Sequence, residues 1–484
     1  MSSLRVLSVA SEMFPLIKTG GLADVTGALP AALESHGVQT CTLLPGYPAV
    51  LRALTDTQRM AVWPDFFGGG ARLLQARFEG RDLLVLDAPH LYAREGNPYL
   101  GPDGHDWPDN AERFAALSFA AARVAWGQAG VEPPQVIHAH DWQAALTPAY
   151  LHYLGEGLPR PRQVLTVHNL AFQGRFDRKV FGRLGLPMGA FTSEGLEYHG
   201  DVGFLKTGLL LADAITAVSP GYADEVRTSQ GGMGLDGILR WRAEAVTGIV
   251  NGIDTEVWNP RTDAHLAARY DEDHLDARRH NRRAVEQHFG LLPEDEGLLL
   301  CMISRMADQK GTDLVLDALD ALLKGGTRLV VLGSGDRELE ARWRSAADHY
   351  RGRLGVQVGY DERVSHLMQG GCDAIVIPSR FEPCGLTQLC GLRYGCVPIV
   401  AHVGGLADTV IDANDAALRA GVATGLHLRS VNHEGLVNGV NKATQLHADR
   451  PTWQRLQRAG MLSDVGWEAS AARYAALYRR GVGQ

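Results

Sequence analysis

A lysine stands just before a pair of glycines near the start of the chain. In SEMFPLIKTGGLADV (11–25), Lys18 precedes Gly20 and Gly21, and a helical pattern that contains Asp24 follows. Glycine lets the backbone approach a ligand closely, and the N–H groups at a helix N-terminus attract an anion. We expect Lys18 to face an anionic group, although a surface lysine beside an ordinary helix start gives the same pattern. The loop is neither a P-loop, because the lysine precedes the glycines, nor a GxGxxG dinucleotide fingerprint.

The sequence GGLAD occurs again at 404–408, also between an apolar run and a helical pattern. Further cations follow the apolar run at 298–304, where Arg305 and Lys310 precede Gly311. Open α/β sheets bind their ligands outside the carboxyl ends of the strands. Two cations at such a place indicate a clamp for a diphosphate group.

The most distinctive stretch, PSRFEPCGLTQLCGLRYG (378–395), joins a strand end to a helix. It places Glu382 next to Cys384 and Gly385, and Leu386 and Thr387 open the helix. A carboxylate accepts hydrogen bonds from sugar hydroxyls, and the free N–H groups of the helix can hold a phosphate. Helix capping by Glu382 is the simpler alternative.

Two other apolar runs end in polar groups, Asp141 in HAHDWQ (138–143) and His168 in TVHNLAFQG (166–174). Both side chains would reach a ligand if the order of the strands brings these ends together. Each residue could equally be a turn former.

Parallel strands are needed to position these groups. Short apolar runs alternate with amphipathic helical patterns such as 111–125, which is typical of parallel sheets covered by helices on both faces. A turn-rich stretch at 246–260 separates two such series, so we expect an α/β fold with two doubly wound domains. Strands are predicted at 4–10, 38–44, 83–88, 136–140, 164–168 and 214–219, and then at 298–304, 328–333, 355–359, 374–379 and 397–401.

Composition excludes several classes of function. The 484 residues, 45% of them hydrophobic, suffice for two or three domains with sizeable cores. The net charge is −8 and no basic block stands out, so nucleic acid is not an expected partner. No apolar run is long enough for a membrane span, and the N-terminus lacks the apolar segment of a signal peptide, so we expect a cytoplasmic protein. The six cysteines include no CxxC pair, which argues against disulfides and a zinc site.

The motifs, taken together and in order, resemble those of one family. KTGGLADV, HAHDW, VHNLAFQG, the Arg305 and Lys310 pair, RFEPCGLTQ and GGLADTV resemble the bacterial glycogen synthases and plant starch synthases. The likeness covers essentially the whole chain, including NPYL (97–100), GHDWPDN (104–110) and VNGIDTEVWNP (250–260). It implies a GT-B glycosyltransferase with two Rossmann-like domains facing across a cleft. The implied reaction transfers glucose from ADP-glucose, with UDP-glucose as an alternative donor, to the non-reducing end of an α-1,4-glucan such as glycogen.

The resemblance also implies roles for individual residues. Three cations and the backbone of the two glycine-bearing helix starts would contact the diphosphate: Lys18, Arg305, Lys310, Gly20, Gly21, Leu386 and Thr387. The transferred glucose would be surrounded by Asp141, His168, Asn251, Glu382, Cys384 and Gly385. Tyr360 would lie near the adenine, Tyr99 near the cleft mouth, and Asp24 would support the glycine loop. We expect neither a metal nor a cofactor, because the cations would stabilise the leaving diphosphate.

The same resemblance places the domain boundaries. The first domain would comprise residues 1–243 and a returning C-terminal helix within 463–484, and the second would comprise 244–462. Two positions depart from related patterns: Cys390 replaces a second glutamate found in many GT-B enzymes, and Gln143 follows HAHDW.

Three alternatives remain open at this point. Another GT-B activity, such as epimerisation or phosphorolysis, would use the same fold, and a phosphorylase would need a lysine for pyridoxal phosphate. A catalytically silent glucan-binding scaffold would not need Lys18, Arg305, Lys310 and Glu382 together. A nicotinamide dehydrogenase is disfavoured because neither GGLAD loop follows the GxGxxG pattern.

Overall fold

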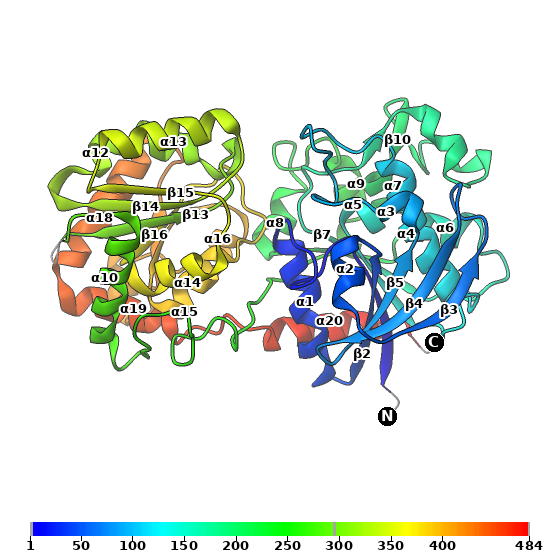
Figure 1. Cartoon of the computed structure of the whole chain (residues 1–484), viewed down its shortest axis with the longest axis horizontal. Coiled ribbons are helices and arrows are strands. Elements are labelled where there is room, and N and C mark those ends of the chain that lie inside the picture. Colours follow the sequence, from blue (N-terminus) through cyan, green and yellow to red (C-terminus); the bar gives the residue numbers. More distant parts are fainter. Residues whose placement is uncertain (1–2, 294–296, 483–484) are drawn as a thin grey trace. The chain divides into compact units, whose positions relative to one another are not determined.

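The computed structural model describes residues 3–293 and 297–482, which form two compact units (Figure 1). The first unit consists of residues 1–251 and 467–484, and the second of residues 252–466. Residues 246–248, which the sequence placed in the second domain, belong to the first because they form a strand of its sheet.

The first unit is built on a nine-stranded sheet with the order β12-β11-β7-β6-β1-β2-β5-β4-β3. The strands from β12 to β5 are parallel, and β4 and β3 add an antiparallel pair at one edge. A small antiparallel sheet accompanies it. The strands of the main sheet are β1 (Leu4–Val9), β2 (Val38–Pro45), β3 (Thr57–Trp63), β4 (Ala71–Phe78), β5 (Arg81–Asp87), β6 (Val136–His140), β7 (Arg162–Val167), β11 (Ala214–Ala217) and β12 (Val246–Gly248), and those of the small sheet are β8 (Arg175–Phe176), β9 (Glu197–Tyr198) and β10 (Asp201–Gly203).

The second unit has a six-stranded, all-parallel sheet with the order β15-β14-β13-β16-β17-β18. Numbered from β13, this is the order 3-2-1-4-5-6 of dinucleotide-binding folds. Its strands are β13 (Leu299–Ile303), β14 (Arg328–Gly333), β15 (Leu354–Val358), β16 (Ala374–Ile377), β17 (Val397–Ala401) and β18 (Leu426–Leu428).

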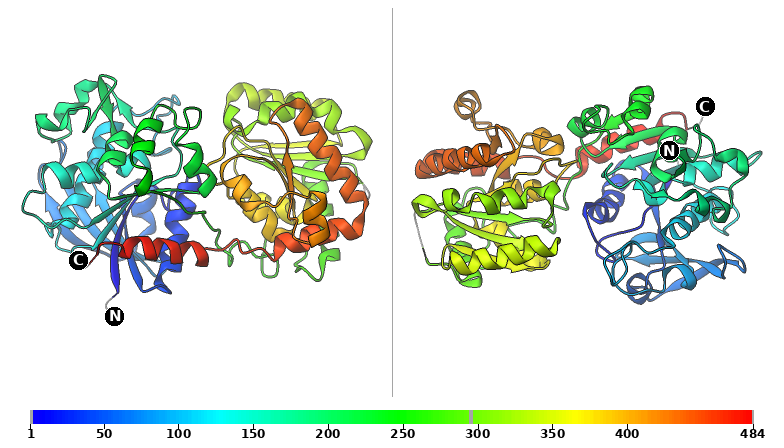
Figure 2. Two further views of the ribbon diagram at one scale, coloured as in Figure 1. Left: turned by 180° about the vertical axis from the view of Figure 1, so that it is seen from behind. Right: turned by 90° about the horizontal axis from the view of Figure 1, so that it is seen from above.

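Helices cover both faces of each sheet, as Figure 2 shows for the second unit. In β13, Leu300 and Met302 pack on one side and Leu299 and Cys301 on the other, so the strand is apolar throughout. The helices of the first unit are α1 (Gly21–Glu34), α2 (Pro48–Ala53), α3 (Pro89–Tyr92), α4 (Asn110–Ala125), α5 (Asp141–Ala144), α6 (Thr147–Tyr153), α7 (Phe204–Leu211), α8 (Pro220–Glu225), α9 (Asp236–Trp241) and α20 (Glu468–Arg479). Those of the second are α10 (Arg278–Phe289), α11 (Thr312–Asp317), α12 (Leu319–Leu322), α13 (Arg337–His349), α14 (Glu362–Gly371), α15 (Thr387–Tyr394), α16 (Gly404–Thr409), α17 (Asp415–Ala420), α18 (His433–Ala448) and α19 (Arg450–Met461).

The last helix, α20, returns to the first unit and lies beside α1 (Figure 1). Ala471, Tyr474 and Tyr478 of α20 pack with Leu29 of α1 and Val6 of β1 in one buried cluster. The apolar stripe of α20 therefore completes a core that the first 251 residues leave open on this face of the sheet.

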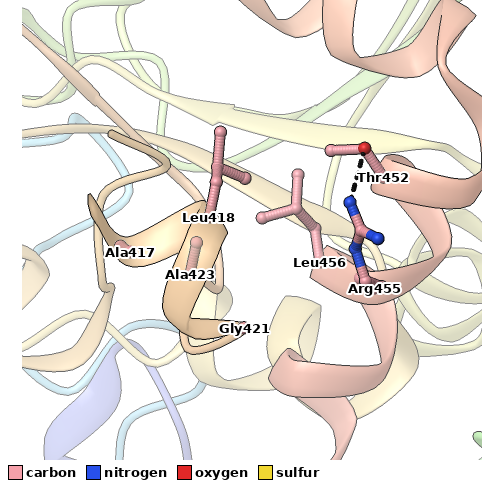
Figure 3. Close-up of a pocket in the computed structure, with 7 residues that line it drawn as sticks. All are labelled: Ala417, Leu418, Gly421, Ala423, Thr452, Arg455 and Leu456. Carbon is pink, nitrogen blue, oxygen red and sulfur yellow. Dashed lines mark hydrogen bonds between the residues drawn. The ribbon is translucent and has the colours of Figure 1, made fainter. Parts of the chain in front are cut away.

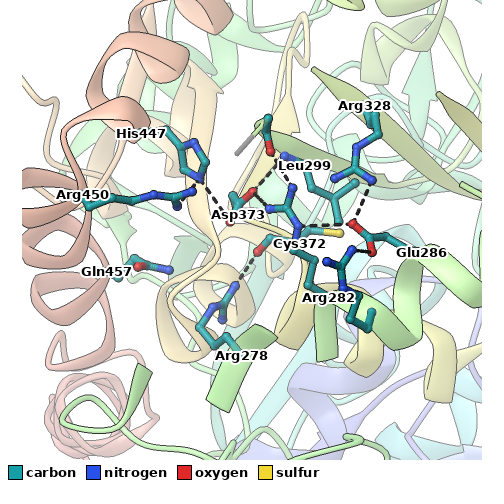
Figure 4. Close-up of polar contacts among 12 residues, drawn as sticks. Arg278, Arg282, Glu286, Leu299, Arg328, Cys372, Asp373, His447, Arg450 and Gln457 are labelled. Carbon is teal, nitrogen blue, oxygen red and sulfur yellow. Dashed lines mark hydrogen bonds and ion pairs between the residues drawn. The ribbon is translucent and has the colours of Figure 1, made fainter. Parts of the chain in front are cut away.

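A buried network of charges ties α10 to the sheet of the second unit (Figure 4). Glu286 forms ion pairs with Arg282 and with Arg328, at 3.3 and 2.8 Å. Asp373 pairs with Arg282 at 2.5 Å and with His447 at 3.4 Å. Burial alone would raise the pKa of Asp373, but these two partners hold it well below its ordinary value. Breaking one member of such a buried network is expected to be strongly destabilising.

No helix within residues 3–293 and 297–482 is both long and apolar enough to cross a membrane. None of the six cysteines forms a disulfide, and Cys301 Sγ lies 3.8 Å from Cys396 Sγ.

Candidate active site

The order of the strands places the polar loops at one point of each sheet. In the first unit the chain order reverses between β1 and β6, and in the second between β13 and β16. Such switch points leave a crevice at the carboxyl ends of the strands, where open α/β sheets bind ligands. The segments that follow these four strands carry Lys18, Asp141, Arg305, Lys310 and Glu382, with Asp141 at the start of α5.

The loop after β1 ends at Gly20, and α1 begins at Gly21. Lys18 Nζ lies 2.7 Å from Asp24 Oδ1 in the first turn of the helix, and both side chains are about one quarter to one third exposed (26% and 30%). Asp24 thus holds the lysine near the helix start, where the N–H groups of the first turn have no partners within the helix. Lys18, Gly20, Gly21 and Asp24 are brought together as the sequence suggested.

Glu12, which sequence reasoning did not single out, organises this loop. Its buried carboxylate accepts hydrogen bonds from the backbone N–H and hydroxyl of Thr19, the latter at 2.7 Å. It also accepts one from the hydroxyl of Tyr99, which lies 2.7 Å from Ser11 Oγ. Burial raises the pKa of Glu12, and the bonds from Tyr99 and Thr19 oppose that rise. Tyr99 is therefore connected to the glycine loop through Glu12.

Asp141 and His168 meet at the ends of β6 and β7. Asp141 Oδ1 accepts a hydrogen bond from the backbone N–H of His168 at 2.6 Å. Burial raises the pKa of Asp141 to about 7, against the lowering effect of this bond, and burial lowers the pKa of His168 to about 3. Asp141 has φ = +54°, a left-handed conformation that is uncommon outside glycine. A residue held in this conformation marks a candidate functional position.

Asn251 follows β12 at the end of the first unit's main segment. Its side chain is buried, and its Oδ1 has no hydrogen-bond partner among the described residues. A buried amide oxygen without a partner is costly. It marks a place where a ligand donor can bind.

In the second unit, Lys310 and Glu382 form a close ion pair. Lys310 Nζ lies 2.8 Å from Glu382 Oε1 and 2.6 Å from Oε2, and Ser379 Oγ donates to Oε2 at 2.9 Å. The Glu382 side chain is 8% exposed and that of Lys310 is 18% exposed. The pair joins the loop after β13 to the loop after β16, so a cation and a carboxylate share the switch point.

The segment after Glu382 depends on two glycines. Gly385 has φ = +74°, which favours glycine. A Cβ on Gly405 would lie 2.3 Å from the carbonyl oxygen of Cys384, so only glycine lets α16 approach this loop. Gln388, another residue that sequence reasoning did not assign, donates to the carbonyls of Cys384 and Gly385 at 3.0 and 2.9 Å. Leu386 precedes α15, which starts at Thr387 and directs its first N–H groups toward this loop.

Arg305 and Tyr360 lie at the surface of the second unit. Arg305 donates a hydrogen bond to Gln309 Oε1 over 3.3 Å. Tyr360 is 61% exposed, and its hydroxyl donates to Glu362 over 2.8 Å. Neither residue contacts the Lys310–Glu382 pair through a described hydrogen bond. A shallow hollow elsewhere in this unit, between α17 and α19 (Figure 3), is lined by none of the candidate residues.

Comparisons with known proteins agree with this geometry. The starch synthase catalytic domain family matches residues 5–241, and the glycosyl transferases group 1 family matches residues 285–459. The glycogen synthase of Rhodopseudomonas palustris BisB18 is 57% identical over 479 residues, 99% of this chain and 98% of that protein. The glycogen synthase of Acidiphilium cryptum is 56% identical over 476 residues, 98% of this chain and 99% of that protein.

Comparison with solved structures agrees with these sequence matches. The catalytic domain of starch synthase IV from Arabidopsis thaliana, bound to ADP and acarbose, matches with a TM-score of 0.91 and 31% identity over 100% of both chains. Sucrose-phosphate synthase from Thermosynechococcus elongatus, at 17% identity and a TM-score of 0.59, shares the fold. The predicted resemblance and fold class are thus confirmed, and the chain belongs to the glycogen and starch synthase family of retaining GT-B glycosyltransferases.

Proposed function

We propose that this protein transfers glucose from ADP-glucose to the non-reducing end of an α-1,4-glucan such as glycogen, with retention of the anomeric configuration. The observation that carries the proposal is the full-length match to the starch synthase bound to ADP and acarbose, together with the cation–carboxylate pair at the β13/β16 switch point. Because a nucleotide sugar does not cross a membrane unaided, the proposal places the reaction in the cytoplasm.

The diphosphate is assigned to the cations and to the backbone of the two helix starts. Lys18 and Lys310 lie in the segments that follow β1 and β13, next to a switch point, and Arg305 is two residues beyond the end of β13. As the bond from C1 to the phosphate breaks, the diphosphate gains negative charge, and preorganised cations stabilise it. The backbone contacts are assigned to Gly20, Gly21, Leu386 and Thr387. No metal is needed for this role.

The glucose is assigned to the polar groups that remain. Asp141, Glu382 and Asn251 offer oxygen atoms for its hydroxyls, and His168 offers a ring nitrogen. Cys384 and Gly385 shape the neighbouring wall. Tyr360 stacks near the adenine, Tyr99 lies at the mouth of the substrate site, and Asp24 supports the loop of Lys18.

The chemistry follows from what these residues can do. Retention by double displacement needs a carboxylate nucleophile close to C1. Glu382 is bound by Lys310 and Ser379, and Asp141 is bound by backbone N–H groups and has a pKa raised to about 7 by its burial. Neither is a free nucleophile. We therefore propose a front-face reaction, in which a phosphate oxygen of the leaving group takes the proton of the acceptor hydroxyl.

The test is a comparison of donors. Purified protein is incubated with ADP-glucose or UDP-glucose, each with and without glycogen, and nucleotide release is measured. We expect ADP release that depends on glycogen, with slower or no release of UDP. Faster turnover of UDP-glucose would overturn the assignment of the donor. Nucleotide release that is independent of glycogen would overturn the transferase assignment.

A further inference from the structure

On one face of the first unit's sheet, the inward side chains change from apolar to polar toward the carboxyl ends of the strands, beneath Asp141 and His168. On the face covered by α1 and α20, β1 carries Leu4, Val6 and then Ser8, while β6 carries Val136 and then two histidines. On the same face, Thr166 of β7 follows Val164, and Thr216 of β11 follows Ala214. The members of this polar layer are Ser8, His138, His140, Thr166 and Thr216, all buried. An apolar core would be the simpler solution, so the layer has a purpose other than packing.

Hydrogen bonds connect this layer to His168. His140 Nδ1 lies 3.0 Å from His168 Nε2, and His140 Nε2 lies 3.1 Å from Ser8 Oγ. The second histidine of β6, His138, bonds instead to Thr166 and to Tyr478 of α20, at 2.5 and 2.7 Å. His140 therefore has one polar partner on each side, and one of them is the candidate glucose-binding histidine.

The positions of the hydrogens follow from the need to satisfy every donor. A neutral imidazole has one N–H donor and one bare acceptor nitrogen. If Ser8 donates to His140 Nε2, then His140 carries its hydrogen on Nδ1 and donates to His168 Nε2. In the reverse arrangement the Ser8 hydroxyl would be a buried donor with no acceptor among the described residues, which is unfavourable.

The rings of His138, His140 and His168 are neutral near pH 7, because burial lowers the pKa of each. Burial lowers the pKa of His140 well below its ordinary value, and the neighbouring His138 and His168 lower it further. The ring centroids of His138 and His140 are 4.0 Å apart and those of His140 and His168 are 5.3 Å apart. No described hydrogen bond or ion pair joins a carboxylate to any of these three rings, and Asp141 bonds to the backbone N–H of His168 instead. A positive charge on one ring would therefore lack a close counter-charge.

We infer that Ser8 and His140 are positioning residues that lock His168 in the tautomer with its hydrogen on Nδ1, so that His168 meets the sugar as a hydrogen-bond donor. His168 Nδ1 has no described hydrogen-bond partner within the protein and is left for the ligand. The inference rests on the proposed function only where it names the sugar. The locked tautomer itself is a property of the protein without substrate.

The tautomer is read directly from nitrogen chemical shifts. Full-length protein with ¹⁵N-labelled histidine is studied near neutral pH, and the His168 signals are identified by their loss in His168→Gln. We expect a pyrrole-like Nδ1 and a pyridine-like Nε2 in the wild type. Ser8→Ala should give a mixture of the two tautomers. A wild-type His168 with its hydrogen on Nε2, or protonated on both nitrogens, would overturn the inference whether or not the protein transfers glucose.

Kinetics of matched variants test the consequence. His140→Asn keeps an N–H close to the place of Nδ1, whereas His140→Leu has none. Losing the partner that orients a metal-binding histidine typically costs about 10- to 100-fold in activity. By analogy we expect a loss of this order in kcat for His140→Leu, and substantial rescue in His140→Asn. His138→Asn, in the same layer but without a described hydrogen bond to His168, should lower the melting temperature yet keep the His168 tautomer. Equal losses of kcat in His140→Asn and His140→Leu at similar melting temperatures would contradict the positioning role.

Discussion

Replacing Glu382 by glutamine removes one charge from the closest ion pair of the second unit's candidate site. Lys310 Nζ is 2.8 and 2.6 Å from the two carboxylate oxygens, and Ser379 donates to one of them. Glutamine keeps the shape of the side chain but offers Lys310 one neutral acceptor. Glu382→Gln therefore releases Lys310 toward a diphosphate and at the same time removes the carboxylate that we propose binds the glucose.

The size of the effect follows from the contact that is lost. A hydrogen bond to a charged group contributes about 1.5–3 kcal/mol, and 1.36 kcal/mol is a factor of ten in rate. If the carboxylate binds glucose more strongly in the transition state, kcat falls by about 10- to 160-fold. ADP should bind as tightly as in the wild type or more tightly, because Lys310 no longer has to break its ion pair with Glu382 in order to contact the diphosphate. The melting temperature should fall, since the pair is mostly buried.

Three measurements follow these effects: kcat from glucose incorporation, the Kd of ADP by calorimetry, and the melting temperature. Asp313→Asn is the matched control, because Asp313 pairs with Arg380 near the same loop but has no proposed role in the site. This exposed pair contributes little, so all three values should stay near the wild type. A kcat for Glu382→Gln within twofold of the wild type would refute the role of the carboxylate. Weaker ADP binding would refute the competition for Lys310.

Three further outcomes are expected. Burial raises the pKa of Asp141 to about 7, so the folded state keeps a proton that the unfolded chain loses, and stability falls as pH rises from about 4 to 7. The melting temperature of Asp141→Asn should therefore exceed that of the wild type above pH 7 but not below pH 4, and the variant should lose glucose transfer. Arg305→Ala and Lys310→Ala should each lose about 10²- to 10³-fold in kcat, while wild-type enzyme dialysed against EDTA stays active; inactivity that added Mg²⁺ fully restores would contradict this. Glu286→Gln should destabilise the protein by about 3 kcal/mol in calorimetry, because Arg328 loses its buried counter-charge; an unchanged melting temperature would show that the network contributes little.

The parallel strands were predictable from sequence, and some neighbouring elements were not. Buried strands such as β13 are apolar on both faces, so they stand out from the helices around them. The edge strand β3 is mostly exposed and has no such signal, and β18 is only three residues long. The strand β12 lay in a stretch that looked like a linker, and only its pairing with β11 places it in the first sheet.

The residues of the candidate site likewise divide into those that the sequence reveals and those that only the structure reveals. Lys18, Lys310 and Glu382 stand in motifs that can be read locally. Glu12 was missed because its role depends on Tyr99, 87 residues away. A glutamate three residues beyond the end of a buried strand is nevertheless a signal that could have found it. The link between His140 and Ser8 spans 132 residues and appears only when β1 and β6 lie side by side.

The most direct test of the account is the stereochemistry of the first bond formed. ADP-glucose labelled with ¹³C at C1 is incubated with the protein and a short α-1,4-glucan, and the anomeric signals are followed by NMR. We predict that the label moves from the α-anomer of the donor to a new α-1,4 linkage at the non-reducing end, in step with ADP release. A β-linked product, or free labelled glucose without extension of the glucan, would contradict the account.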